Sequence, residues 1–177
     1  MMKIIWSPWL RLIHGLLAAS TILAFVSHEG TSRLHAWHEC FGYVALCMAA
    51  CRIWLGFTAN GPLKNYWRFS GFVLGLRATL RYTNNLIHLR EARHIGHNPL
   101  GAWMVVALLA NSVLCGLTGW LFTTDMFWGY AWLEKLHGAL GEAFVPLVVL
   151  HLLGVAYSSY RHKESLIAAM IHGKKLT

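Results

Sequence analysis

Residues 136–157 read LHGALGEAFVPLVVLHLLGVAY, a mostly apolar stretch that is long enough to cross a membrane as one helix. It contains two histidines, His137 and His151, which are fourteen residues apart. In an α-helix this separation corresponds to about 21 Å of rise and to a rotation only about 40° short of four full turns. Both rings are therefore predicted to leave one helix on one face, at two different depths.

The rest of the chain has the composition of a membrane protein. Of its 177 residues, 56% are hydrophobic and 12% are charged, and the mean hydropathy is +0.47. Soluble domains carry about 25% charged residues, so an ordinary soluble domain is excluded. Four stretches are long enough to span the bilayer, at residues 9–26, 37–57, 100–122 and 136–157. They predict an all-α integral membrane protein, a four-transmembrane-helix bundle that forms a single domain over residues 1–177.

The distribution of the cations predicts the orientation. The net charge of +8 comes from residues beside the spans rather than from a recognition element, so no nucleic acid partner is expected. The short connections after the first and third spans contain only Arg33 and Lys135. The N-terminus, the long middle connection and the tail hold most of the other cations. The positive-inside rule therefore places both termini in the cytoplasm.

The long middle connection has helical periodicity at about residues 72–90. One face carries Arg77, Arg81, Asn84 and His88, and another carries Val73, Leu76, Leu80 and Ile87. This pattern predicts an amphipathic helix that lies on the cytoplasmic surface of the membrane and is attracted to anionic lipid. Docking of a cytoplasmic partner is the alternative. Asn98 and Pro99 then suit the cap and the first turn of the third span.

With this orientation, four histidines in or beside the spans divide into two pairs by depth. His14 on the first span and His151 on the fourth lie toward the cytoplasmic side, whereas His38 on the second span and His137 on the fourth lie toward the outer side. Two neutral imidazoles on facing helices are the axial ligands of a b-type haem iron. The chain therefore predicts two stacked b haems, with the pairs His38/His137 and His14/His151.

Neighbouring residues agree with this interpretation. Three of the four histidines are followed by a glycine about one turn later: Gly42 after His38, Gly141 after His137 and Gly154 after His151. A porphyrin that lies against a helix needs such room, although glycine also helps membrane helices to pack. Arg52 lies fourteen residues after His38 on the same face. It is a candidate partner of a haem propionate, and snorkelling to the headgroups is the alternative.

Other readings of the histidines remain open. Intramembrane histidines also relay protons or bind transported metal ions, but the spans offer few acidic partners, namely Glu39 and Glu142 near the outer level. His35 is the main rival of His38 as a ligand. The remaining histidines, His28, His88, His94, His97, His162 and His172, lie in connections or in the tail, where solvated or structural roles are expected. The four cysteines form no C-x-x-C-H motif, so covalent c-type haem is not indicated.

Several motifs together resemble the bacterial cytochrome b561 family, which shares its domain with the b-type cytochrome subunit of nickel-iron hydrogenases. They are Arg11-Leu12-Ile13-His14, His38 with Gly42-Tyr43 and Arg52, Gly96-His97-Asn98-Pro99-Leu100-Gly101, His137-Gly138, His151-Leu152-Leu153-Gly154 and the tail Ala169-Met170-Ile171-His172-Gly173-Lys174. The likeness covers nearly the whole chain. It implies a multi-pass cytochrome of the bacterial inner (cytoplasmic) membrane that holds two non-covalent haems b on His14, His38, His137 and His151.

The resemblance also implies electron transfer between the quinone pool and an outer partner. The expected partner is a periplasmic c-type cytochrome or another redox protein, so the chain would act as a quinol or quinone oxidoreductase or as a subunit of one. The alternatives are a superoxide-quinone oxidoreductase, and a membrane anchor of a periplasmic hydrogenase or multihaem cytochrome. Trp128, Tyr130 and Trp132 are candidates for an outer docking patch, and interfacial anchoring explains them equally well. No catalytic side chain is predicted.

Overall fold

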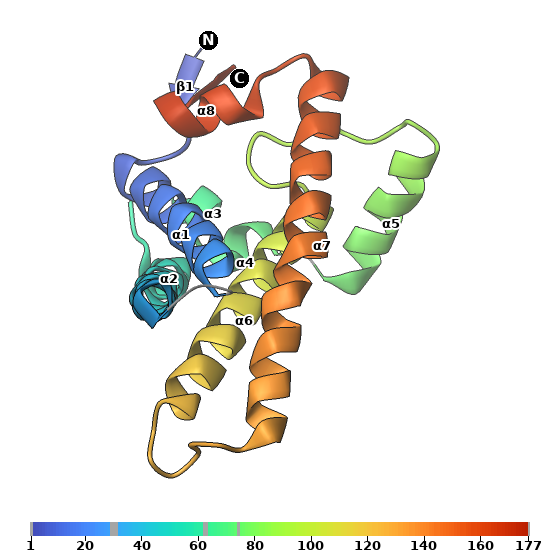
Figure 1. Ribbon diagram of the computed structural model, residues 1–177. Coiled ribbons are helices and arrows are strands. Elements are labelled where there is room, and N and C mark those ends of the chain that lie inside the picture. Colours follow the sequence, from blue (N-terminus) through green and yellow to red (C-terminus); the bar gives the residue numbers. More distant parts are fainter. Residues whose placement is uncertain (1, 29–31, 62–63, 74, 177) are drawn as a thin grey trace. The chain divides into compact units, whose positions relative to one another are not determined.

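The computed structural model describes residues 2–28, 32–61, 64–73 and 75–176, and most of these residues are helical (Figure 1). The long helices are α1 (Pro8–Ser27), α2 (Ser32–Thr58), α6 (Pro99–Phe122) and α7 (Ala131–His162). The short elements are the helices α3 (Lys64–Trp67), α4 (Phe69–Phe72), α5 (Leu76–Ile87) and α8 (Leu166–His172), and the strands β1 (Met2–Ile4) and β2 (Lys174–Leu176).

Four helical segments are long and apolar enough to cross a membrane: Pro8–Ser27, Ala36–Thr58, Pro99–Phe122 and Ala131–His162. The prediction of an all-helical protein with four membrane-spanning helices is confirmed. Helix α7 begins and ends outside the predicted range 136–157, because hydropathy marks only the apolar part of a helix. Its first turn carries Glu134 and its last turn carries Arg161 and His162, and charges at these two ends interact favourably with the helix dipole.

The interfacial helix predicted at about residues 72–90 corresponds to a shorter helix in the structure. Helix α4 ends at Phe72, the backbone is extended at Val73 and Gly75, and α5 covers only Leu76–Ile87. The apolar periodicity of the sequence continues beyond the hydrogen-bonded turns, which explains why the predicted helix was too long. Leu89 then takes a positive φ of 56°, which ends the helical conformation.

The rotation of α5 about its axis is set by one polar contact and one aromatic contact. The indole Nε1 of Trp103 on α6 donates to the hydroxyl of Thr79 at 3.1 Å, and Tyr82 packs edge-on against the ring of His94. Thr79 and Tyr82 are buried as a result. The apolar residues Leu76, Leu80 and Ile87 stay exposed on a different face.

The chain forms two compact units. Unit 1 contains Met1–Arg11, Trp54–Ala107 and Val149–Thr177, and unit 2 contains Leu12–Ile53 and Leu108–Val148. Helices α1, α2, α6 and α7 each contribute to both units. The single-domain organisation stays a prediction.

In unit 1 the two ends of the chain pair with each other. Strand β1 is antiparallel to β2, with Lys3 opposite Lys175, and Figure 1 shows both termini beside α8. Gly173 ends α8 with a φ of 79°, and its carbonyl accepts hydrogen bonds from the amides of Ile5 and Trp6. A Cβ at position 173 would lie 2.6 Å from the carbonyl oxygen of Trp6, so glycine is required there. The sequence did not predict these strands, because three residues carry no recognisable period.

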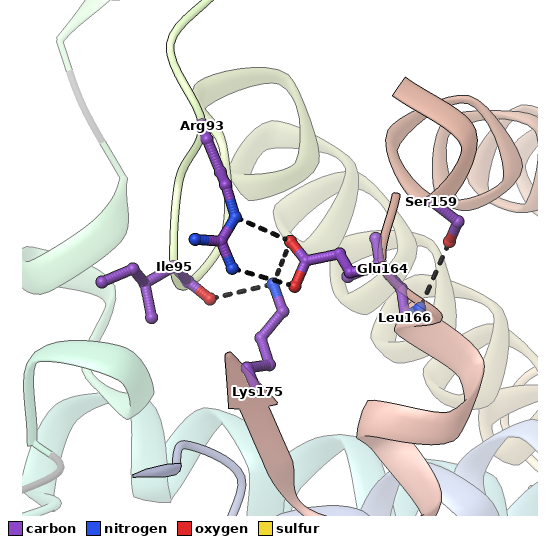
Figure 2. Close-up of polar contacts among 6 residues, drawn as sticks. All are labelled: Arg93, Ile95, Ser159, Glu164, Leu166 and Lys175. Carbon is purple, nitrogen blue, oxygen red and sulfur yellow. Dashed lines mark hydrogen bonds and ion pairs between the residues drawn. The ribbon is translucent and has the colours of Figure 1, made fainter. Parts of the chain in front are cut away.

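An ion-pair cluster fixes this pair of terminal strands to the segment before α6 (Figure 2). The carboxylate of Glu164 accepts from both Nε and a terminal guanidinium nitrogen of Arg93, at 3.3 and 3.2 Å. The ammonium of Lys175 lies 3.6 Å from the same carboxylate and donates to the carbonyl of Ile95 at 3.0 Å. Burial alone would raise the pKa of Glu164, but the hydrogen bond from Arg93 and the positive charges of Lys175 and Arg93 lower it overall.

Unit 2 is held together by close contacts between helices. In Figure 1 the second half of α6 and the first half of α7 run side by side from the connection that joins them. The amide of Asn111 on α6 donates to the carbonyl of Leu140 on α7 at 3.0 Å. A Cβ at Gly116 would lie 2.9 Å from the side chain of Leu46 on α2, so the glycine allows α6 and α2 to approach.

Candidate haem-binding site

His38 and His137 face each other in unit 2, His38 from α2 and His137 from α7. The ring centroids are 5.9 Å apart and the ring planes are nearly perpendicular, at 89°. A metal ion bound by two imidazoles forms bonds of about 2 Å to each nitrogen, which puts the two nitrogens about 4 Å apart. In each ring the centroid lies farther from the metal than the ligating nitrogen does, so the centroids are farther apart than the nitrogens. The centroid separation of 5.9 Å therefore suits two rings on opposite sides of one metal ion.

The hydrogen bonds of the two rings decide which nitrogen each ring can offer. Nδ1 of His38 lies 2.8 Å from the carbonyl oxygen of Ala24 on α1, and Nδ1 of His137 lies 3.0 Å from that of Cys115 on α6. A carbonyl oxygen only accepts, so each Nδ1 must carry the proton and donate. A neutral ring then has its lone pair on Nε2, the arrangement that a metal-bound histidine uses.

His38 and His137 both line a cavity of about 740 Å³. Gly42, Gly138 and Gly141 also line it, and a Cβ at any of the three would meet no atom within 4 Å. The glycines therefore leave open space against α2 and α7. A flat macrocycle of haem size has room there, in a mostly apolar lining of the kind that cofactor sites have.

The donor set argues against a site made of protein ligands alone. Among the described residues, no group of three or more histidine, cysteine or carboxylate side chains is placed to hold a metal ion. Structural zinc takes four protein ligands and catalytic zinc takes three. Two imidazoles beside a large apolar cavity instead fit a metal whose remaining ligands come from a macrocycle.

Three residues of this site were missed by the sequence analysis: Cys115, Thr118 and Gly119, all on α6. Cys115 supplies the carbonyl that binds Nδ1 of His137, and the hydroxyl of Thr118 lies 3.2 Å from the same nitrogen. A Cβ at Gly119 would lie 2.8 Å from Cε1 of His137. The small residues Gly116 and Gly119, three positions apart in a span, are a signal for close helix packing, but they do not reveal which ring packs there.

The other predicted site residues, His14, Arg52 and His151, lie on three different helices. His14 is exposed on α1 in unit 2, and His151 is partly buried on α7 in unit 1. Their pairing therefore stays a prediction. Arg52 on α2 is buried, with 7% of its surface exposed. The side chain of His35, the rival of His38, lies outside the described residues.

The comparisons with known proteins agree with this combination of helices and histidines. The family model of prokaryotic cytochrome b561 matches residues 5–173. The chain therefore belongs to the prokaryotic cytochrome b561 family, as its motifs predicted. It is a multi-pass b-type membrane cytochrome that takes part in electron transfer. No match was found among curated proteins or among solved structures.

Proposed function

We propose that the protein is a dihaem cytochrome b, a four-helix bundle that passes electrons between the quinone pool and a redox protein on the outer side of the bacterial inner membrane. The observation that carries this proposal is the pair His38 and His137, whose donating Nδ1 atoms leave both Nε2 atoms for iron beside a cavity of about 740 Å³. These residues fit a haem between α2 and α7.

The same pair defines what the chain itself contributes to the outer haem. The carbonyls of Ala24 and Cys115 hold the two imidazoles in one tautomer and one orientation, and the apolar lining keeps water from the ligands. A bound haem supplies reversible one-electron transfer at its iron. The protein then tunes the potential through its axial ligands, their hydrogen bonds and the surrounding dielectric.

The inner haem rests on His14 and His151, with Arg52 as partner of a propionate. His151 follows His137 by fourteen residues on one helix, so it offers a second ligand about 21 Å away along the axis. The burial of Arg52 supports a partner within the protein rather than snorkelling to the headgroups. The quinone would react on this cytoplasmic side, where both termini and most of the cations are proposed to lie.

The acidic outer surface supports a protein partner of positive charge. Outer residues 28–39 and 123–142 contain five of the seven acidic residues of the chain but only two of its fifteen lysines and arginines. Glu39, Glu134 and Glu142 lie in the lining of the cavity that holds His38 and His137. Such a surface attracts a basic c-type cytochrome and repels an anion such as superoxide. No observation favours the superoxide alternative.

Helix α5 is proposed to lie on the cytoplasmic membrane surface. Its exposed Leu76, Leu80 and Ile87 form an apolar face about one-third of a turn from Arg77 and Arg81. This combination suits insertion of leucine and isoleucine below the headgroups while arginine contacts anionic lipid phosphates.

A spectroscopic experiment tests the main proposal. The purified protein is titrated with dithionite and with a quinol, and its haem content is measured as pyridine haemochrome. We expect two b haems per chain, both reducible by the quinol. A protein with no haem, or two haems that quinol fails to reduce, would contradict the proposal. A haem-free protein that conducts protons or metal ions in liposomes would favour the transporter alternative.

A further inference from the structure

The hydroxyl of Thr118 has an unusual position for a threonine in a membrane helix. It is buried, and Oγ1 lies 2.9 Å from the carbonyl oxygens of both Leu114 and Cys115 on its own helix, α6. The same Oγ1 lies 3.2 Å from Nδ1 of His137 on α7. Thr118 therefore contacts a candidate haem ligand as well as its own backbone.

The chemistry of these partners fixes the direction of each hydrogen bond. Both carbonyl oxygens only accept, so the single hydroxyl proton of Thr118 is donated to one of them. Nδ1 of His137 must donate, because it also lies 3.0 Å from the carbonyl of Cys115. A lone pair of the Thr118 oxygen then faces this N–H, so the proton on Nδ1 is shared between two acceptors, the Cys115 carbonyl and the Thr118 hydroxyl.

We propose that Thr118 is a positioning residue of the outer haem, which fixes the ring of His137 and lowers the reduction potential of the iron through it. This inference rests on the proposed function, in which His137 is an axial ligand. An acceptor at the N–H of a metal-bound imidazole raises the basicity of the ligating nitrogen. A more basic ligand stabilises the ferric state over the ferrous state, so the potential falls.

The simpler explanation is that Thr118 only satisfies its own hydroxyl on the helix backbone, as threonine and serine often do. Ser112 provides a matched comparison for this. It lies on the same helix, is equally buried, lines the same cavity and donates to the carbonyl of Leu108 at 2.8 Å. Among the described residues its hydroxyl forms no hydrogen bond to a histidine ring. Ser112→Ala therefore removes a backbone-bonded hydroxyl without touching His137.

The test compares Thr118→Val, Thr118→Ser and Ser112→Ala with the wild-type protein. Haem content, the midpoint potential of each haem and the EPR spectrum of the oxidised protein are measured, and the outer haem is assigned by its loss in His38→Ala. We expect Thr118→Val to shift the outer haem to a higher potential and to change its low-spin EPR signal. Thr118→Ser should restore both values. Ser112→Ala alters the polarity of the cavity lining but no bond to His137, so it should shift the outer potential less than Thr118→Val does and leave the EPR signal unchanged.

The outcomes separate this inference from the proposed function. If Thr118→Val kept two haems with an unchanged outer potential and EPR signal, the role of Thr118 would be overturned but the proposed function would stand. A shift of the outer potential in Ser112→Ala equal to that in Thr118→Val would have the same meaning. Loss of the outer haem in Thr118→Val, with retention in Thr118→Ser and Ser112→Ala, would support positioning of His137. Loss in all three variants would contradict it. A wild-type protein without b haem would overturn the proposed function and this inference with it.

Discussion

Gly119 on α6 leaves the space that the ring of His137 occupies, since a Cβ at position 119 would lie 2.8 Å from Cε1 of that ring. Real Cβ atoms do not approach a ring carbon so closely, so any side chain at this position must displace either the ring or the helix. The ring is also held by the carbonyl of Cys115, 3.0 Å from Nδ1. The position of the His137 ring therefore depends on residue 119 having no side chain.

This relationship predicts that Gly119→Ala weakens or abolishes the outer haem. Overpacking of a filled interior costs about 1–3 kcal/mol, which here is relieved by moving His137 away from its ligating position. We expect purified Gly119→Ala to contain about one haem per chain by pyridine haemochrome. The proposed inner haem on His14 and His151 serves as the internal control. Full retention of both haems with wild-type spectra would show that the ring tolerates the methyl group.

Single histidine substitutions should remove the haems in pairs. His38→Ala and His137→Ala are each expected to lose the same spectral component, because each leaves the outer iron with one axial ligand. His14→Ala and His151→Ala should lose the other component. His88→Ala, on the exposed surface near the end of α5, is the control and should keep both haems. If His38→Ala and His151→Ala removed the same component, the assignment of the pairs would be wrong.

The sequence predicted the parts of this protein that follow from period and composition. Four long helices were expected from apolar stretches, and the structure contains four helices that are long and apolar enough to cross a membrane. Asn98 was expected to cap the third span, and its side chain does accept from the amide of Gly101 at 2.7 Å. Each of these features depends on residues that are close together in the sequence.

The features that sequence reasoning missed depend on contacts between distant segments. The approach of Thr118 and Gly119 to His137 is set by the packing of α6 on α7, which no local pattern encodes. The pairing of β1 with β2 joins the two ends of the chain through three residues each. The start of α5 was misplaced for a different reason: apolar periodicity continued across the extended backbone at Val73 and Gly75.

The ion-pair cluster in unit 1 predicts a pH-dependent stability. The pKa of Glu164 is lowered from its usual value of 4.5, so its contribution is complete above pH 4.5 and is lost as the pH falls through the lower folded-state pKa. At neutral pH we expect Glu164→Gln to be less stable by about 1.5–3 kcal/mol, the range for hydrogen bonds to charged groups. Thermal unfolding in detergent at several pH values measures the difference.

The control for this prediction is Asp125→Asn, which removes an exposed carboxylate in the connection between α6 and α7. Its Tm should stay close to that of the wild-type protein over the same pH range. The difference between wild type and Glu164→Gln should shrink below pH 4.5, where the carboxyl of the unfolded chain takes up a proton, and should be lost as the pH falls through the lower folded-state pKa. A difference that stays constant down to pH 3 would mean that the charge of Glu164 does not stabilise the packing of the two terminal strands.

The acidic surface that we propose to face outward predicts that electron transfer to a basic protein partner depends on salt. Glu39, Glu134 and Glu142 line the cavity of the outer site, and attraction between such carboxylates and a basic partner raises the association rate. Counterions screen this attraction, with a Debye length of about 10 Å at 0.1 M salt. Stopped-flow oxidation of the reduced protein by a basic c-type cytochrome should therefore slow markedly as salt increases, whereas oxidation by an acidic one should not. The double variant Glu39→Gln/Glu134→Gln should show a weaker salt dependence with unchanged haem content. If the rate with the basic cytochrome instead increased with salt, a cationic partner would be excluded.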